Sequence, residues 1–114
     1  MPNSFLSKYD TFEKRQSLCN LFKNKHPTRI PIVVTLFSDK SQYKYLVPRD
    51  VTMGNFIGIF RNSCNVNSSK ALFFLCNNIL LPVSRDMIDI YDEMADRDGF
   101  LYITAKEENV FGTN

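Results

Sequence analysis

The sequence predicts an α+β domain with a mixed sheet, on the evidence of two hydrophobic periodicities and their order along the chain. Some segments carry apolar residues at helical spacing, and others are short β-branched or aromatic runs. The predicted order is helices, a hairpin, a helix, a strand, a turn, a helix and a last strand. A β-β-α-β order with a helix crossing the sheet is that of a β-grasp domain. At 114 residues, 44% of them hydrophobic, the chain can bury one core and is too short for two.

The N-terminal segment is predicted to hold two helices, a short one within residues 3–9 and a longer one from Thr11 to Asn24. Asp10 and Glu13 have the spacing of a capping box at the start of the longer helix. His26 ends it, because the residue before a proline avoids the helical region. The longer helix has one apolar stripe, formed by Phe12, Leu18, Cys19, Leu21 and Phe22.

A β-hairpin is predicted next, from Ile30–Phe37 through a polar turn into Tyr43–Pro48. Alternation places Lys44 and Leu46 on one face of the second strand. It places Tyr45 and Val47 on the other face, toward the helix that follows. A strand whose two faces serve different neighbours can border two grooves, which favours binding over catalysis.

The second half continues with a helix from Met53 to Ser63, capped by Thr52. Ala71–Cys76 is apolar throughout and is expected to be a strand covered on both faces. Beyond it the sequence predicts a turn at Asn77-Asn78, a brief extended piece at Ile79–Leu81, a helix capped by Ser84, and a last strand at Phe100–Thr104.

Charge is unevenly spread along the chain. Residues 1–85 hold 12 basic and four acidic side chains, whereas residues 86–114 hold two and eight. A basic surface suits acidic partners. The pI of 8.5 is lower than that of most nucleic-acid-binding domains, so we expect no nucleic acid as a partner.

Catalytic and metal-binding patterns are not found in the sequence. The single histidine, His26, is seven residues from Cys19, which is too far for a nucleophile and its base on one helix. No Cys or His pair has zinc-ligand spacing either. Because a nucleophile–base pair and a metal-ligand pair are both missing, we expect no enzyme, no metal and no cofactor. Three widely spaced cysteines indicate reduced thiols in a cytoplasmic protein. No apolar run is long enough to span a bilayer.

Several motifs together resemble the autophagy ubiquitin-like modifiers, the GABARAP-like proteins, over nearly the whole chain. They are F-E-K-R at 12–15, H-P-T-R-I-P-I-V-V at 26–34, K-Y-L-V-P at 44–48, A-L-F-F-L-C-N-N at 71–78, G-F-L-Y-I at 99–103 and V-F-G at 110–112. The resemblance implies a ubiquitin-like β-grasp with two extra N-terminal helices and a four-stranded mixed sheet. It divides the chain into a helical extension (1–25), a ubiquitin-like domain (26–106) and a flexible tail with a processing site (107–114).

The family resemblance also implies a function. A cysteine protease trims the precursor after Gly112, next to Phe111, and activating and carrier enzymes pass that glycine to phosphatidylethanolamine. The covalent lipid, rather than a cofactor, then attaches a cytoplasmic monomer to the autophagosome membrane. The folded body binds aromatic-x-x-aliphatic motifs of cargo receptors and of the autophagy machinery by strand addition.

Matching positions assign two pockets beside the strand Lys44–Leu46. The first, for the motif aromatic, uses Leu18, Phe22, Pro31, Val33, Lys44, Leu46 and Phe100. The second, for the aliphatic residue, uses Tyr45, Val47, Pro48, Val51, Phe56 and Ile59. Leu18 stands where relatives often carry an acidic residue, and only Lys44 remains of the basic run that usually precedes Y-L-V-P. Arg29, Lys44 and Arg49 are therefore expected to meet the acidic residues that flank a motif.

A second function remains open on the sequence alone. A ubiquitin-like adaptor that is never conjugated could use the basic N-terminal helices in trafficking or in cytoskeleton binding. Gly112 separates the two hypotheses, because only the conjugated modifier requires it.

Overall fold

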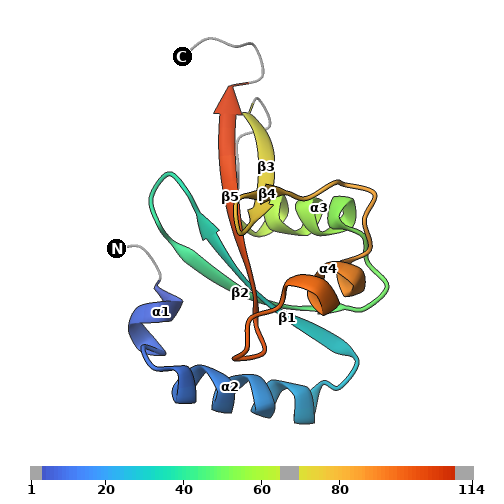
Figure 1. The fold of residues 1–114 in the computed structure, drawn as a ribbon. Coiled ribbons are helices and arrows are strands. Elements are labelled where there is room, and N and C mark those ends of the chain that lie inside the picture. Colours follow the sequence, from blue (N-terminus) through green and yellow to red (C-terminus); the bar gives the residue numbers. More distant parts are fainter. Residues whose placement is uncertain (1–3, 65–69, 110–114) are drawn as a thin grey trace.

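The computed structural model describes residues 4–64 and 70–109, and Figure 1 shows a sheet with helices on both of its faces. The elements in chain order are α1 (Phe5–Lys8), α2 (Phe12–Lys25), β1 (Arg29–Leu36), β2 (Gln42–Pro48), α3 (Met53–Cys64), β3 (Lys70–Cys76), β4 (Ile79–Leu80), α4 (Met87–Met94) and β5 (Leu101–Asn109).

The sheet is mixed and has the order β2-β1-β5-β3-β4. Its central pair, β1 and β5, is parallel, and the outer pairs are antiparallel. The predicted α+β class and β-grasp order are thus confirmed. The sheet has five strands instead of four because Asn77 and Asn78 both adopt positive φ. This conformation makes a tight two-residue turn, which returns Ile79–Leu80 as β4 against the end of β3.

The larger core lies between the sheet and helices α3 and α4. The inward side chains of β1 and β5 alternate along each strand, for example Ile32 and Val34 on β1. Phe56 and Phe60 of α3 and Ile90 of α4 are fully buried against them. This side of the sheet therefore supplies most of the apolar burial that stabilises the domain.

A smaller core lies on the opposite face of the sheet, beneath α1 and α2. Phe5 of α1 and Cys19 of α2 are buried against Val33 of β1 and Phe100, the residue before β5. The rings of Phe5 and Phe100 meet edge to face, with centroids 5.0 Å apart. The N-terminal helices are thus integral to the fold.

Of the three predicted helix caps, Thr52 is confirmed, because its Oγ1 accepts the Asn55 N–H at 3.1 Å, and the other two are wrong in detail. The side chain of Thr11, rather than Asp10, accepts the Lys14 N–H at the start of α2 (3.2 Å). Asp10 instead accepts from the Lys14 ammonium at 3.0 Å. Helix α4 begins at Met87 with Asp86 as its N-cap and no side-chain capping bond, so Ser84 does not cap it.

Two strand expectations also need correction. Phe73 on β3 is 38% exposed, so this strand is not covered on both faces. Its neighbours Phe74 and Cys76 are buried, which is the alternation of a strand with one open face. Strand β5 runs to Asn109, beyond the expected end at Thr104, because β3 pairs with it as far as Asn109.

Candidate functional site

Strand β2 forms one edge of the sheet. Among the described residues it pairs with β1 alone, so the backbone groups along its outer side have no strand partner. Such an edge can accept an added strand. The hairpin register places Val33 opposite Lys44 and Pro31 opposite Leu46, so the four side chains share the face that α2 covers.

The residues predicted for the first pocket lie at this face, between β2 and α2. Leu18 and Phe22 of α2 are half-buried and pack on the small core that contains Val33 and Phe100. Because Val33 and Phe100 are fully buried, they can only form the floor. The lining accessible from outside consists of Leu18, Phe22, Lys44 and the half-buried Leu46.

Two basic side chains are held at the rim of the first pocket. The Lys44 ammonium lies 4.8 Å from the centroid of the Phe22 ring, a cation–π contact that covers this part of the pocket. Arg29 donates from Nη1 to the Leu46 carbonyl at 3.2 Å. Arg49 is exposed at the far end of the strand. All three cations expected to meet acidic residues thus lie on or beside β2.

The residues predicted for the second pocket lie on the other face of β2, toward α3. Val47 and Phe56 are buried and form its base, and Tyr45 and Val51 are half-buried against the same core. The rings of Tyr45 and Phe56 cross edge to face, with centroids 5.2 Å apart. Ile59 (39% exposed) and Pro48 are open to solvent.

The Tyr45 hydroxyl is fixed at the end of α3. It forms hydrogen bonds with Ser63 Oγ (2.5 Å) and Cys64 Sγ (3.6 Å). Burial raises the pKa of Tyr45 well above its ordinary value, so the phenol is neutral over the physiological range. Tyr45 therefore presents an apolar ring whose hydroxyl is held by hydrogen bonds and stays protonated, which does not suit an acid or base.

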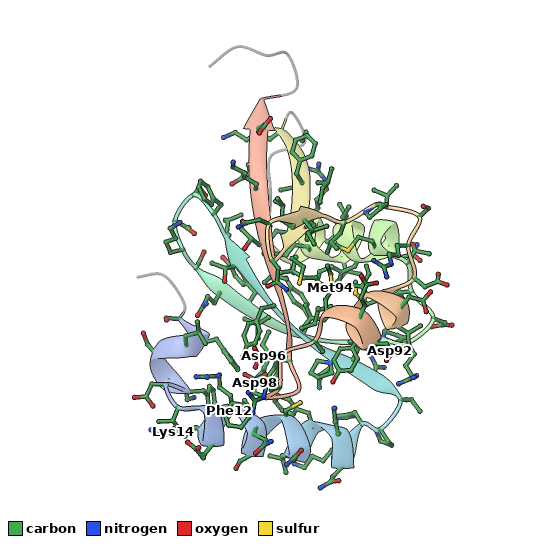
Figure 2. The ribbon with its side chains drawn as sticks, viewed as in Figure 1. Phe12, Lys14, Asp92, Met94, Asp96 and Asp98 are labelled. Carbon is green, nitrogen blue, oxygen red and sulfur yellow. The ribbon has the colours of Figure 1, made fainter. Side chains whose placement is uncertain are left out.

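A buried polar cluster fixes α2 relative to the sheet and thus sets the shape of the first pocket. Asp98, in the turn before β5, is labelled in Figure 2 and has a side chain that is 1% exposed. It accepts from Arg15 Nε of α2 at 2.9 Å, from the Phe100 N–H at 2.9 Å, and from the Tyr102 hydroxyl. Burial, followed by the bond to Asp98, raises the pKa of Tyr102.

Other expectations concern chemistry rather than binding. Cys19, Cys64 and Cys76 are all free thiols. Within residues 4–64 and 70–109, no three His, Cys, Asp or Glu side chains are placed together as metal ligands. No helix in that same part of the chain has the length and apolar character needed to cross a membrane. The predicted processing site, Phe111 and Gly112, lies outside the described residues.

Some residues beside the site were not anticipated from the sequence. Two hollows beside the predicted first-pocket residues are lined by Lys8 at the end of α1, Tyr9 of the α1–α2 connection, Leu21 of α2, and Gln42 and Tyr43 of β2. Leu18 and Leu21 are three residues apart in an amphipathic segment, which was the available signal. This spacing alone does not predict a hollow, because the position of α1 beside α2 depends on contacts between residues that are distant in sequence.

Comparison with known proteins agrees with this fold. A family model described as "Autophagy protein Atg8 ubiquitin like" matches residues 14–112. Autophagy-related protein 8e of Arabidopsis thaliana is 38% identical over 109 residues, covering 90% of this chain and 88% of the relative. Autophagy-related protein 8 of Schizosaccharomyces pombe is 40% identical over 109 residues, covering 90% and 89%.

The structural comparison gives the same result. The crystal structure of Trypanosoma brucei ATG8 superimposes with a TM-score of 0.83 at 36% identity, covering 96% of this chain and 99% of that one. A β-grasp sheet with an edge strand between two candidate pockets, and with helices on both faces, defines a ubiquitin-like protein. The matches make the family plain: the chain belongs to the Atg8 family of autophagy proteins.

Proposed function

We propose that this protein is an autophagy modifier that is trimmed after Gly112, conjugated through that glycine to phosphatidylethanolamine, and used as a docking platform for aromatic-x-x-aliphatic motifs. The observation that carries the docking part is the edge strand β2, with Lys44 and Leu46 facing α2 and Tyr45 and Val47 facing α3. An extended peptide added to this edge presents alternate side chains to opposite faces, as two pockets require.

The conjugation part is supported by the sequence at the end of the family match, which runs to Gly112. A glycine suits a scissile and acyl-transfer position because it has no side chain to obstruct a narrow catalytic channel. Phe111 supplies an apolar handle for the protease. The lipid amide carries two acyl chains, which is sufficient for stable anchoring without a transmembrane helix.

The proposed partners follow from these two activities. They are a processing cysteine protease, the activating and carrier enzymes, and receptors that carry the motif. The protein acts as a monomer, in the cytoplasm before conjugation and on the autophagosome membrane after it. It performs no catalysis itself.

The tail is tested by intact mass spectrometry of the protein recovered from cells. We expect loss of Thr113-Asn114 and a mass increase of one phosphatidylethanolamine in the membrane fraction. Gly112→Ala should block trimming or conjugation, whereas the matched variant Thr113→Ala should be processed as the wild type is. A Gly112→Ala protein on membranes at wild-type levels would instead support the unconjugated adaptor.

The groove is tested separately, by titration calorimetry with a motif peptide. Leu46→Ala should weaken binding by about 1–3 kcal/mol if Leu46 lines the aromatic pocket. Leu80→Ala, which truncates an exposed leucine on β4 at the opposite edge of the sheet, is the matched control. If folded Leu46→Ala and the wild type bind the peptide with equal affinity, Leu46 does not line the aromatic pocket.

A further inference from the structure

A hollow of about 530 Å³ lies at the junction of α1 and α2. Its apolar lining comes from Tyr9, Leu18 and Leu21, and its rim carries Lys8, Lys14 and Glu13. Leu21 is 47% exposed, an unusual exposure for a large aliphatic side chain in the middle of a helix. The hollow is thus apolar at its base and predominantly basic at its edge.

A second hollow connects the surroundings of this hollow to β2. Lys8 and Tyr9 also line this second hollow, of about 430 Å³, whose other wall is the first half of β2 from Gln42 to Tyr45. Leu18 packs on the small core that contains Val33 and Phe100, two residues of the first predicted pocket. The two hollows therefore adjoin each other at Lys8 and Tyr9, between the edge strand and Leu21.

The order of the proposed pockets sets the direction of a bound peptide. The aromatic pocket is at Lys44, and the aliphatic pocket lies further along β2 toward Pro48, so the motif runs parallel to the strand. The residues that precede the aromatic then lie beside Gln42 and Tyr43, where the second hollow begins. With a rise of about 3.3 Å per residue, two or three preceding residues extend roughly 7–10 Å from the aromatic.

The charges around the hollow define the kind of segment that fits it. Two ammonium groups and one carboxylate surround the apolar base. Lys14 is already paired with Asp10 at 3.0 Å, whereas the Lys8 ammonium lies 5.7 Å from the Tyr9 ring centroid. A large aliphatic side chain flanked by acidic residues would fill the base and complement the rim.

We propose that the Tyr9–Leu18–Leu21 hollow is a third pocket of the motif groove, which binds a large aliphatic side chain two or three residues before the motif aromatic. This inference rests on the proposed docking function. It defines a preference within the motif class, for peptides of the form aliphatic-x-x-aromatic-x-x-aliphatic or with one spacer residue fewer. The pocket adds specificity because an unfilled apolar base loses the burial that a leucine supplies.

The test uses two pairs of peptides, each identical except for leucine or alanine three, or two, residues before the aromatic. By titration calorimetry, wild-type protein should bind the leucine member of at least one pair about tenfold more tightly than its alanine partner. Leu21→Ser should reduce that preference to less than about twofold. Leu21 is half-exposed, so the serine variant should fold, which circular dichroism verifies. Leu80→Ser, which changes an exposed leucine on the opposite edge strand β4, should keep the full tenfold preference.

The alternative outcomes are distinguishable. If wild type binds none of the peptides, the docking function itself fails and the third pocket with it. If it binds all equally, or if Leu21→Ser keeps the preference, the groove stands and the third pocket is overturned. Sedimentation without peptide excludes another occupant: self-association that Leu21→Ser abolishes would assign the hollow to a second copy of the chain.

Discussion

The ammonium of Lys44 lies over the ring of Phe22, 4.8 Å from its centroid, and so joins β2 to α2 across the first pocket. The contact is at the surface, where a cation–π pair is worth about 0.5–1 kcal/mol, and thermal motion can therefore open it. Under the proposed docking function, a motif aromatic that enters the pocket would displace this lysine from the ring or share it. The displaced ammonium is then available to an acidic residue of the peptide.

Replacing Lys44 should therefore affect peptides according to their charge. In Lys44→Met, an acidic-flanked motif peptide should lose about 0.5–1 kcal/mol of binding free energy at low salt, because the methionine keeps the apolar stem and removes the charge. A neutral-flanked peptide should lose less. Calorimetry at two salt concentrations measures both, with Lys25→Met at the exposed end of α2 as the control. An identical loss for the two peptides would contradict this role of the charge.

Gly99 is a position where only glycine fits. Its φ is +101°, and a Cβ there would overlap Cys19 Sγ and lie 3.3 Å from Cys19 Cβ. Gly99→Ala should lower the free energy of unfolding by about 2–4 kcal/mol, through backbone strain and overpacking. Gly58→Ala is the matched control, because a methyl group added there on α3 would have no neighbouring atom within 4 Å and alanine favours a helix. Urea denaturation compares the two, and a stable Gly99→Ala would show that the turn before β5 can move away from α2.

The Asp98 cluster should be a major determinant of stability. Asp98→Ala leaves Arg15 and Tyr102 without their shared acceptor and should cost about 3–5 kcal/mol, as the removal of one partner of a buried pair does. Asp10→Ala removes a carboxylate from an exposed pair and should leave the thermal midpoint unchanged. Thermal denaturation measures both. Similar midpoints for the two variants would mean that the buried pair contributes little.

Stability should decrease in alkaline solution. Burial raises the pKa of the Cys19 and Cys76 thiols and of the Tyr45 and Tyr102 phenols above their ordinary values. The unfolded chain then releases these protons at lower pH than the native state, so the free energy of unfolding falls as pH rises. The thiol contribution begins near the ordinary thiol pKa of about 8.5 and the phenol contribution near about 10.

Urea denaturation between neutral pH and about pH 10.5, just above the ordinary phenol pKa, measures this dependence. The double variant Cys19→Ala/Cys76→Ala should lose the part that begins at the thiol pKa and keep the part from the phenols. A free energy of unfolding that stays constant over the range, in the wild type, would contradict the buried-thiol and buried-phenol contributions.

The sequence was sufficient to predict the groove strand, because strand alternation depends on local chemistry alone. Lys44 and Leu46 were expected on one face and Tyr45 and Val47 on the other, and the hairpin register has them so. It did not reveal which neighbours complete each pocket. That Leu18, Phe22 and Phe100 come together depends on contacts between residues about 80 positions apart, and only the family resemblance suggested it.

The errors in prediction have local physical causes. Asp10 and Thr11 are both good caps, and the choice between them depends on where the chain enters α2 after the short helix α1. The apolar run at Ala71–Cys76 looked fully buried, but no helix of the described chain covers Phe73, which stays exposed. The hollow at Leu21 was missed because an exposed leucine and a core leucine are identical in sequence.

The position of β5 has a consequence for how the molecule is made. It is the strand that joins the two halves of the sheet, pairing with β1 on one side and with β3 on the other. It is also the last element of the described chain to be synthesised, and Leu101 pairs with Ile32, about 70 residues earlier. During synthesis the β1–β2 and β3–β4 hairpins therefore each expose an unpaired apolar edge. The chain is most prone to aggregate during this interval. Only the addition of Leu101–Asn109 closes both edges, so we expect a nascent chain that stalls before this strand to bind chaperones rather than to work in part.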